Sequence, residues 1–282
     1  MTDSARELPM PIKIAVVQFE IQQFVPNANL NKAERFVREA SAEAEIIVFP
    51  EDFVVGPLKG RKEFIDHDGR YVKHFQQLAA TYKIDIVTGS IPEGYNGDLY
   101  NTTYYIDTAG TIRGSYRKVN LWLSERSYIT PGKEICVFDT DYGKVGLIIC
   151  WDLMFPEIFR AMVKQGVEIV ICPSYWCLED AGVGIKHDEQ SEIKLVNALC
   201  VTRAFENEVV LVYANAAGTV GDEENKSILI GQSQITVPFK GAVRSLHHNQ
   251  EAMFIQEVDT SILADAEIAY QIKQGLKSGS LP

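Results

Sequence analysis

Residues 144–152 read KVGLIICWD, an apolar run that ends in a cysteine, a tryptophan and an aspartate. The run Val145–Ile149 is typical of a strand that is buried on both faces. The residues after Trp151 lead into Phe155–Gly166, which has the spacing of a short helix. The stretch therefore predicts a turn from strand to helix, with Cys150 at its start.

A similar pattern occurs near the beginning of the chain. Residues 13–19 read KIAVVQF and residues 45–50 read EIIVFP, which echo KVGLIIC at 144–150 and EIVICP at 168–173. Each pair runs strand, helix, strand and then proline, which suggests two similar β–α–β halves stacked face to face. Short buried strands also resemble one another by chance, so the repeat supports this arrangement without deciding it.

Outside the repeat the pattern changes from alternating strands and helices to hairpins. Leu99–Asp107 and Thr111–Lys118 are joined by a glycine-containing turn, which is a hairpin signal. Lys186–Glu206 predicts a long helix, Ile228–Pro238 a late strand and Ile262–Gln274 a terminal helix. This mixture predicts a layered α/β fold with mixed sheets.

The composition is that of an ordinary globular protein. The chain has 282 residues, of which 46% are hydrophobic and 23% charged, so it can bury a substantial core without disulfides or metal. Neither a low-complexity linker nor a charge block divides it. We therefore predict one domain over residues 1–282, with a core at about 12–258 and a C-terminal tail at 259–282.

Charge and cysteine usage exclude several classes of protein. The net charge is −11 and no Lys/Arg cluster tracks phosphates, which argues against nucleic acid and membrane surfaces as partners. The first residues contain no apolar core of a secretory signal, and the apolar runs are too short to span a bilayer. Five scattered cysteines do not resemble an extracellular disulfide framework. We expect a cytoplasmic protein.

No motif points to a metal or a cofactor. The sequence has no paired C-x-x-C spacing, no GxGxxG and no GKS/T loop. The five histidines lie far from Cys150 in sequence, so a cysteine–histidine pair is not evident. We predict that the protein uses neither a metal nor a cofactor.

Cys150 is the first candidate for chemistry. A nucleophile at a strand-to-helix turn is held rigidly, and the flanking backbone N–H groups can stabilise an oxyanion. The nearby helix N-terminus is expected to lower the pKa of the thiol. The alternative is that Cys150 is simply a small core residue that ends an apolar strand.

Glu51 follows the second strand of the first half, at the position where α/β sheets place ligands. Apolar neighbours would raise the pKa of its carboxyl group and make it a proton shuttle. The alternative is a solvated loop acid, which is how we interpret the neighbouring Asp52.

Lys118 ends the second strand of the predicted hairpin, and Arg117 should point to the opposite face. A buried ammonium group near a thiolate would stabilise a developing oxyanion. The alternative is a surface lysine. Glu125 follows seven residues later and could hold Lys118 or position the substrate.

With these residues in place, the sequence resembles the nitrilase superfamily, the carbon–nitrogen hydrolases, over nearly the whole chain from Ile12 to about Val258. A single Phe-Pro-Glu is a weak signal, but the full set in this order is specific. The motifs are Phe49-Pro50-Glu51, Tyr116-Arg117-Lys118-Val119-Asn120-Leu121, Ile148-Ile149-Cys150-Trp151-Asp152, Phe155-Pro156-Glu157, Pro173-Ser174, Arg203-Ala204 with Glu206-Asn207, Asn215 with Gly218, and Gly231 with Ser233, Ile235 and Pro238.

The resemblance implies that Glu51, Lys118 and Cys150 form the catalytic triad and that Glu125 is the supporting second glutamate. It implies a four-layer α-β-β-α sandwich with two mixed sheets, paired through its outer helices into a homodimer or a higher homo-oligomer. By the same resemblance, Arg203 and its neighbours at the end of the long helix have a structural role.

The resemblance further implies a cysteine-dependent hydrolase of non-peptide carbon–nitrogen bonds, acting on a small linear amide or N-carbamoyl compound with release of ammonia. Cys-Trp-Asp before Phe-Pro-Glu looks more like the amidases, whereas true nitrilases usually carry Cys-Trp-Glu. We expect Trp151, Asp152, Tyr175 and Trp176 to line the substrate pocket. The loop from Tyr175 to Asp180 is aromatic and acidic, which would suit a cationic or neutral substrate.

Our mechanistic hypothesis starts with Glu51 taking the thiol proton as Cys150 attacks the carbonyl group. Lys118 and the backbone N–H of Trp151 hold the oxyanion, and water then hydrolyses the thioester. Three alternatives stay open: a nitrilase acting on a nitrile, an enzyme that transfers the acyl group to another acceptor, and a scaffold without turnover.

Overall fold

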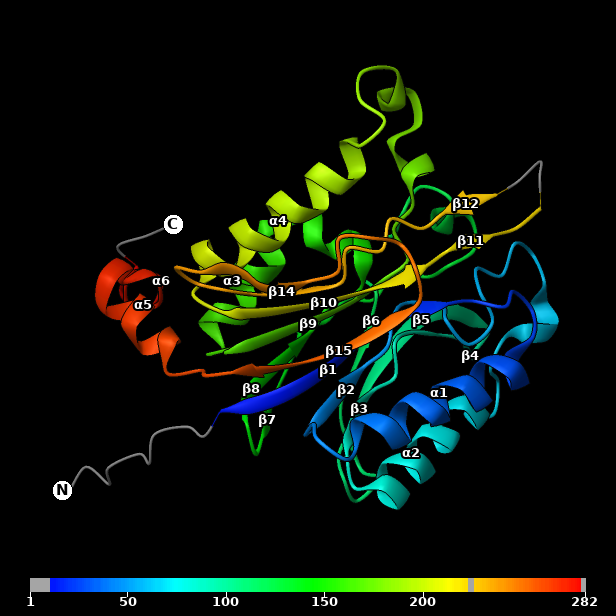
Figure 1. Cartoon of the computed structure of the whole chain (residues 1–282), viewed down its shortest axis with the longest axis horizontal. Coiled ribbons are helices and arrows are strands. Elements are labelled where there is room, and N and C mark those ends of the chain that lie inside the picture. Colours follow the sequence, from blue (N-terminus) through cyan, green and yellow to red (C-terminus); the bar gives the residue numbers. More distant parts are fainter. Residues whose placement is uncertain (1–10, 223–225, 280–282) are drawn as a thin grey trace.

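The computed structural model describes residues 11–222 and 226–279. It contains helices and strands in an order that alternates in the first part of each half (Figure 1). The elements are β1 (Ile12–Glu20), α1 (Pro26–Ala40), β2 (Ile46–Val48), η1 (Lys62–Phe64), α2 (Arg70–Tyr82), β3 (Asp85–Val87), β4 (Ile91–Tyr95), β5 (Asp98–Ile106), β6 (Ile112–Arg117), η2 (Glu125–Ser127), β7 (Cys136–Thr140), β8 (Gly143–Leu147), η3 (Cys150–Met154), α3 (Pro156–Lys164), β9 (Ile169–Ser174), η4 (Leu178–Lys186), α4 (Ser191–Asn207), β10 (Val210–Ala217), β11 (Thr219–Val220), β12 (Ser227–Ile228), β13 (Gln234–Val237), β14 (Gly241–Ser245), β15 (Ala252–Val258), α5 (Ile262–Tyr270) and α6 (Ile272–Ser278), where η denotes a 3-10 helix.

The two halves of the predicted repeat have the same strand pairing. In the first half β1 pairs in parallel with β2, and β2 with β3. In the second half β8 pairs in parallel with β9, and β9 with β10. The crossover helices are α1 and α2 in the first half and α3 and α4 in the second.

The register and the side-chain contacts also repeat. Ile14 lies opposite Ile46 in the first half, and Val145 lies opposite Ile169 in the second. The backbone N–H of Lys13 donates to Glu45 Oε2 at 2.6 Å, and that of Lys144 donates to Glu168 Oε2 at 2.9 Å. The structure therefore contains two β–α–β units of the same geometry, as the sequence repeat suggested.

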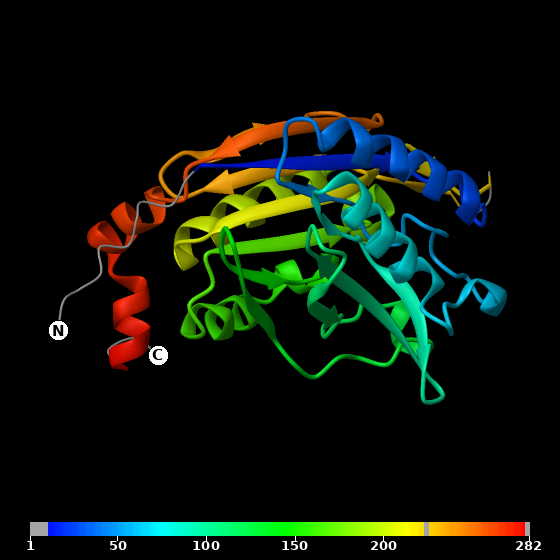
Figure 2. The same cartoon turned by 90° about the horizontal axis from the view of Figure 1, so that it is seen from below.

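The alternation of side chains along β1 defines the layers. Ile14 and Val16 belong to the same buried cluster as residues of β8 and β9, so this face of β1 packs against the second half. Ala15 and Val17 belong to a second cluster together with side chains of α1 and α2. Because strand residues alternate between faces, the strands of both halves lie between two layers of helices. Figures 1 and 2 show α1 and α2 on one side of the strands and α3 and α4 on the other.

The strands of the two halves are joined at one end by hydrogen bonds. Phe19 and Glu20 at the end of β1 pair in parallel with Ala216 and Ala217 of β10. The paired strands run in the order β4-β5-β3-β2-β1-β10-β9-β8-β7, and hairpin strands add antiparallel partners. The predicted α/β class with mixed sheets is confirmed, although its two sheets share this junction.

Two predicted elements are interrupted where residues adopt positive φ, and a third starts later than predicted. Gly231 and Gln232 have φ of 63° and 60°, so Ile228–Pro238 divides into β12 and β13. Gln271, with φ of 55°, separates α5 from α6. Such residues cannot continue a right-handed helix or a regular strand. The helix predicted over Lys186–Glu206 starts only at Ser191, because Lys186 still belongs to the 3-10 segment η4.

The segment after Val258 packs on the second half and is not a detached tail. Leu263 of α5 and Leu276 of α6 are buried in the cluster that contains β8, β9 and β10. Residues 280–282 of the predicted tail, like residues 1–10, lie outside the described residues. Within residues 11–222 and 226–279, no helix combines the length and the apolar character needed to cross a bilayer.

Candidate active site

Cys150 lies at the turn between the second-half strand and a helix, as the sequence predicted. Ile148 and the extended Ile149 follow β8, and Cys150 then begins η3 with φ of 47°. A non-glycine residue in this region costs about 1–3 kcal/mol, so the surrounding structure must hold it there. The side chain is 7% exposed.

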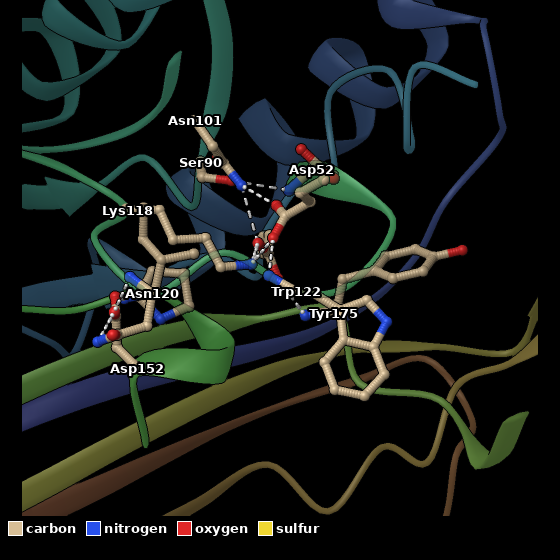
Figure 3. A network of polar contacts seen from close by, with 12 residues as sticks. Asp52, Ser90, Asn101, Lys118, Asn120, Trp122, Asp152 and Tyr175 are labelled. Carbon is tan, nitrogen blue, oxygen red and sulfur yellow. Dashed lines mark hydrogen bonds and ion pairs between the residues drawn. The ribbon is translucent and has the colours of Figure 1, made fainter. Parts of the chain in front are cut away.

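Asp152 holds this turn in place. Its carboxylate accepts hydrogen bonds from Tyr116 Oη at 2.8 Å, from the backbone N–H of Asn120 at 2.8 Å and from that of Ile149 at 3.0 Å. The prediction that Asp152 lines the pocket is wrong, because the first turn of η3 directs this fully buried side chain towards Asn120 instead. Figure 3 shows the contact between Asp152 and Asn120.

Glu51 is buried just after β2 and is held by three donors. Its Oε1 atom accepts from Lys118 Nζ at 2.8 Å and from Asn101 Nδ2 at 2.9 Å. Its Oε2 atom accepts from the backbone N–H of Tyr175 at 2.9 Å, so strands of both halves fix this carboxylate. Burial raises the pKa of Glu51, and the nearby Lys118 charge opposes this shift only in part.

Lys118 lies between two carboxylates. Its ammonium group is 2.8 Å from Glu51 Oε1 and 2.7 Å from Glu125 Oε2, and the residue is 2% exposed. Burial alone would lower the pKa of Lys118, but Glu51 and Glu125 raise it well above its ordinary value. Lys118 is therefore a fixed positive charge rather than a surface lysine.

Asn101 of β5 completes this cluster, and sequence analysis missed it. Its Nδ2 atom donates to Glu51 Oε1 at 2.9 Å and to Glu125 Oε1 at 3.2 Å (Figure 3). The backbone carbonyl group of Asn101 accepts from the backbone N–H of Lys118 at 2.9 Å. Thr102 pairs with Arg117 at the end of the hairpin, and Asn101 and Lys118 are the next residues of the two strands, so the register was the one signal that could have identified Asn101.

The environment of Cys150 raises the pKa of its thiol, contrary to our expectation. Burial and then the Glu51 charge raise this pKa well above the ordinary value, and Lys118 offsets them only in part. The first turn of a short 3-10 helix does not outweigh this loss of hydration. The thiol therefore keeps its proton and needs a base, and Glu51 lies close enough to accept a hydrogen bond from it.

A pocket of about 260 Å³ opens beside these residues. All three tryptophans of the chain line it, with ring centroids 4.4 Å apart for Trp122 and Trp151 and 5.5 Å apart for Trp151 and Trp176. Trp151, Tyr175 and Trp176 were expected here, whereas Trp122 was not. The lining residues are Glu51, Asp52, Pro57, Lys59, Lys118, Trp122, Ser124, Glu125, Tyr128, Cys150, Trp151, Tyr175, Trp176, Cys177, Asp180 and Ser227.

Comparison with known proteins agrees with this geometry. The family model described as carbon-nitrogen hydrolase matches residues 13–266, which include every residue of the cluster. The chain belongs to the carbon-nitrogen hydrolase family. The predictions of this family and of a carbon–nitrogen hydrolase are thereby confirmed.

Two Bacillus subtilis proteins are among the relatives of this carbon-nitrogen hydrolase. The 2-oxoglutaramate amidase is 30% identical over 250 residues, covering 87% of this chain and 90% of the relative. The probable hydrolase YhcX is 30% identical over 272 residues, but the chain spans about half (51%) of its length.

The fold matches that of Saccharomyces cerevisiae Nit3, a member of branch 10 of the nitrilase superfamily. The TM-score is 0.81 at 24% sequence identity, and the alignment covers 95% of this chain and 97% of Nit3. At this level of identity the similarity shows the fold alone.

Asp52 of this carbon-nitrogen hydrolase is not the solvated loop acid that we expected. It is half-buried, lines the pocket and has φ of 55°. Burial, followed by the charges of Glu51 and Glu125, raises the pKa of Asp52 well above its ordinary value. A half-buried carboxyl residue next to the cluster therefore belongs to the lining of the pocket.

Several other residues support the site from behind. Arg203 donates to the carbonyl groups of Leu153 at 3.0 Å and Met154 at 3.1 Å, and its ion pair with Glu206 measures 2.6 Å, which gives it the expected structural role. Trp176 donates from its indole nitrogen to Glu192 of α4 at 2.5 Å. In the part of the chain that the structure describes, no group of three or more His, Cys, Asp or Glu side chains is arranged to hold a metal ion.

Proposed function

We propose that this carbon-nitrogen hydrolase is a cysteine-dependent amidase that hydrolyses a small linear amide through a thioester on Cys150. The observation that carries the proposal is the buried cluster of Glu51, Lys118 and Glu125 beside that thiol, at the base of a pocket lined by tryptophans. A base, a fixed cation and a nucleophile in one water-poor space are what acyl transfer requires.

In the first step Glu51 takes the proton of the Cys150 thiol. A carboxylate offers about four lone-pair positions. Lys118, Asn101 and the backbone N–H of Tyr175 occupy three of them, which leaves one on Oε2 for the thiol. The resulting thiolate is stabilised by the Lys118 charge and attacks the carbonyl carbon.

In the second step the tetrahedral oxyanion needs donors that are already in place. Lys118 stays charged because two carboxylates flank it, and the backbone N–H of Trp151 follows the nucleophile directly. One oxyanion donor is typically worth about 3 kcal/mol. Glu125 and Asn101 keep the ammonium group and Glu51 in register during this step.

The protonated Glu51 then gives its proton to the departing nitrogen, and the C–N bond breaks to release ammonia. The acyl group is left on the sulfur of Cys150 as a thioester. Glu51, again a carboxylate, takes a proton from water, which attacks the thioester and releases the carboxylic acid. The proton then returns to the thiol, so the cycle is balanced.

An amide is the favoured substrate. One relative is named as an amidase of 2-oxoglutaramate, a small linear amide, and it matches this chain along nearly its whole length. A pocket of about 260 Å³ suits a compound of that size. A homodimeric assembly and a cytoplasmic location stay predictions from the sequence.

The test is a panel of short amides, N-carbamoyl amines and nitriles, with ammonia release measured alongside the intact mass of the protein. We expect ammonia from amides and an acyl adduct on Cys150, both abolished in Cys150→Ala. The control is Cys136→Ala, which removes a half-buried thiol on β7, outside the pocket. Undiminished turnover in Cys150→Ala would refute the mechanism. An adduct without ammonia turnover would indicate transfer to another acceptor.

A further inference from the structure

The charges that line the pocket are unbalanced. Four carboxyl groups and two ammonium groups belong to its lining residues, a formal balance of −2. Lys118 is committed to Glu51 and Glu125, at 2.8 and 2.7 Å. The remaining charged groups of the lining are the acids Asp52 and Asp180 and the base Lys59.

Lys59 lies at the mouth of the pocket rather than inside it. It is exposed, and it also lines two neighbouring hollows on the surface. Asp52 and Asp180 are both half-buried. The interior beyond the catalytic cluster is therefore acidic, and the basic group is at its rim.

The two aspartates have acceptor capacity to spare. In the described parts of the chain, no hydrogen bond or ion pair reaches the carboxylate of Asp52, whose backbone N–H donates to Ser90 Oγ at 3.2 Å. Asp180 Oδ2 accepts from the backbone N–H of Cys177 at 2.9 Å, and the Cys177 thiol also hydrogen-bonds to this carboxylate, which leaves two of its roughly four lone-pair positions open. Both carboxylates are half-buried and keep acceptor positions open to the pocket, so a cationic ligand would stabilise both.

The aromatic walls add a second feature that favours a cation. Trp122, Trp151 and Trp176 surround the same space, and Tyr128 and Tyr175 extend it. Indole rings attract ammonium groups through their negative faces. A pocket lined by aromatic rings and by half-buried carboxylates solvates an ammonium group and repels a carboxylate.

We propose that the pocket selects primary amides whose acyl chain carries an ammonium group, which Asp52 and Asp180 bind between the indole rings. This rests on the proposed amidase activity, because ammonia leaves and only the acyl chain can extend into the pocket. The chain would then differ from the relative named for 2-oxoglutaramate, whose substrate carries a carboxylate.

The protonation of the two aspartates agrees with this assignment. Burial raises the pKa of Asp180 to about 6, and burial with Glu51 raises that of Asp52. A bound ammonium group lowers both pKa values, so binding at pH 6 releases protons. Proton release is measurable by calorimetry in two buffers of different ionisation enthalpy.

The experiment compares three amides of similar length: 5-aminopentanamide, hexanamide and the monoamide of glutarate. We expect kcat/KM to be about tenfold or more higher for the ammonium compound than for hexanamide, and lowest for the anionic one. Asp52→Asn and Asp180→Asn should each reduce the ratio of the first two values by about tenfold. Glu179→Gln is the matched control, because it removes the same charge from an exposed neighbour outside the pocket, and it should keep the ratio.

A preference for hexanamide or for the anionic amide, or a ratio unchanged in both aspartate variants, would overturn the assignment and leave the amidase proposal standing. If no amide is turned over, the amidase proposal fails by itself. The binding of the same three compounds to Cys150→Ala, measured by calorimetry, then decides the charge preference separately.

Discussion

The two β–α–β halves have the same backbone arrangement, but equivalent positions carry side chains with different roles. Lys13 and Lys144 make the same contact with Glu45 and Glu168, and the strand registers agree residue by residue. At the equivalent position of the first strand, however, the first half carries Phe19 and the second carries Cys150. Phe19 continues β1 and packs against other phenylalanine rings, whereas Cys150 turns away from its strand with φ of 47°.

At the end of the second strand, it is the first half that carries the catalytic candidate. Glu51 follows β2, and its equivalent Ser174 ends β9. The backbone N–H of Glu51 donates to the carbonyl group of Ser174 at 3.2 Å, so the two equivalent strand ends meet at the site. The comparison teaches that the repeat supplies a rigid edge where strands end, and that single side chains at that edge supply the chemistry.

The largest expected difference in kcat is between substitutions of Glu51 and of its equivalent Ser174. Glu51→Gln keeps the shape but cannot accept a proton, so kcat should fall by about 10²- to 10⁴-fold. Ser174→Ala should cost less than about tenfold, because the hydrogen bond of its hydroxyl group with the Cys150 thiol affects the pKa of that thiol less than burial, Glu51 or Lys118 do. Steady-state kinetics measure both, and equal losses would contradict the assigned division of roles.

The pH profile sharpens this prediction. Burial raises the pKa of Glu51 above 4.5, and the mechanism needs its carboxylate form. The acid limb of kcat/KM should therefore lie above pH 4.5 and vanish in Glu51→Gln. An acid limb retained in that variant would assign the titration to another group.

The next largest effect on rate is expected for Asp152, and its equivalent Ile21 in the first half serves as the comparison. Asp152→Ala leaves the buried hydroxyl group of Tyr116 and the N–H groups of Asn120 and Ile149 without their acceptor, which should cost about 3 kcal/mol of stability. We also expect a loss in kcat of about 100-fold, because a nucleophile displaced by about 1 Å loses this much. Ile21→Ala should cost about 2–5 kcal/mol of stability without a comparable loss in rate. Urea unfolding and kinetics on the same samples test both.

The helix ends at Lys83 and Glu208 are also equivalent, since each is a left-handed residue that ends a crossover helix. Lys83 is exposed, whereas burial and a hydrogen bond with Glu267 raise the pKa of Glu208 to about 7. The folded state therefore prefers the protonated form of Glu208, and its contribution to stability is full below pH 4.5 and lost as the pH rises through about 7. Glu208→Gln should flatten the dependence of the unfolding free energy on pH by about 2 kcal/mol over this range. Lys83→Gln, the matched variant, should leave the slope unchanged.

The smallest expected loss of stability should be the same in the two halves. Glu45→Ala and Glu168→Ala each remove a half-buried acceptor from the same backbone N–H position, so each should cost about 1 kcal/mol. The two losses should agree within about 0.5 kcal/mol. A clear difference in urea midpoints would show that the halves are not energetically equivalent despite their common geometry.

Much of the fold could be predicted because buried strands show themselves in the sequence. The runs KIAVVQF and KVGLIIC indicated the repeat, and the structure confirms it down to matching glutamate contacts. The interruptions at Gln232 and Gln271 could not be predicted, because these side chains do not ordinarily adopt positive φ and only tertiary packing holds them there. The junction of β1 with β10 is likewise a tertiary contact without a local signal.

The candidate site was predictable where its residues end strands or follow them. Glu51, Lys118, Glu125 and Cys150 were expected to meet, and the structure brings them together. Asn101 was missed because its role depends on hairpin register. The predicted direction of the Cys150 pKa shift was wrong, because the depth at which the thiol is buried cannot be read from a short motif.

The gathering of every tryptophan around one cavity has a spectroscopic consequence. Trp122, Trp151 and Trp176 are the three tryptophans of the chain, all line the pocket, and the Trp151 ring contacts the other two. The tryptophan emission of the protein therefore arises wholly from the walls of its candidate active site. Occupancy, acylation and product release can each be followed by stopped-flow fluorescence in the unlabelled protein.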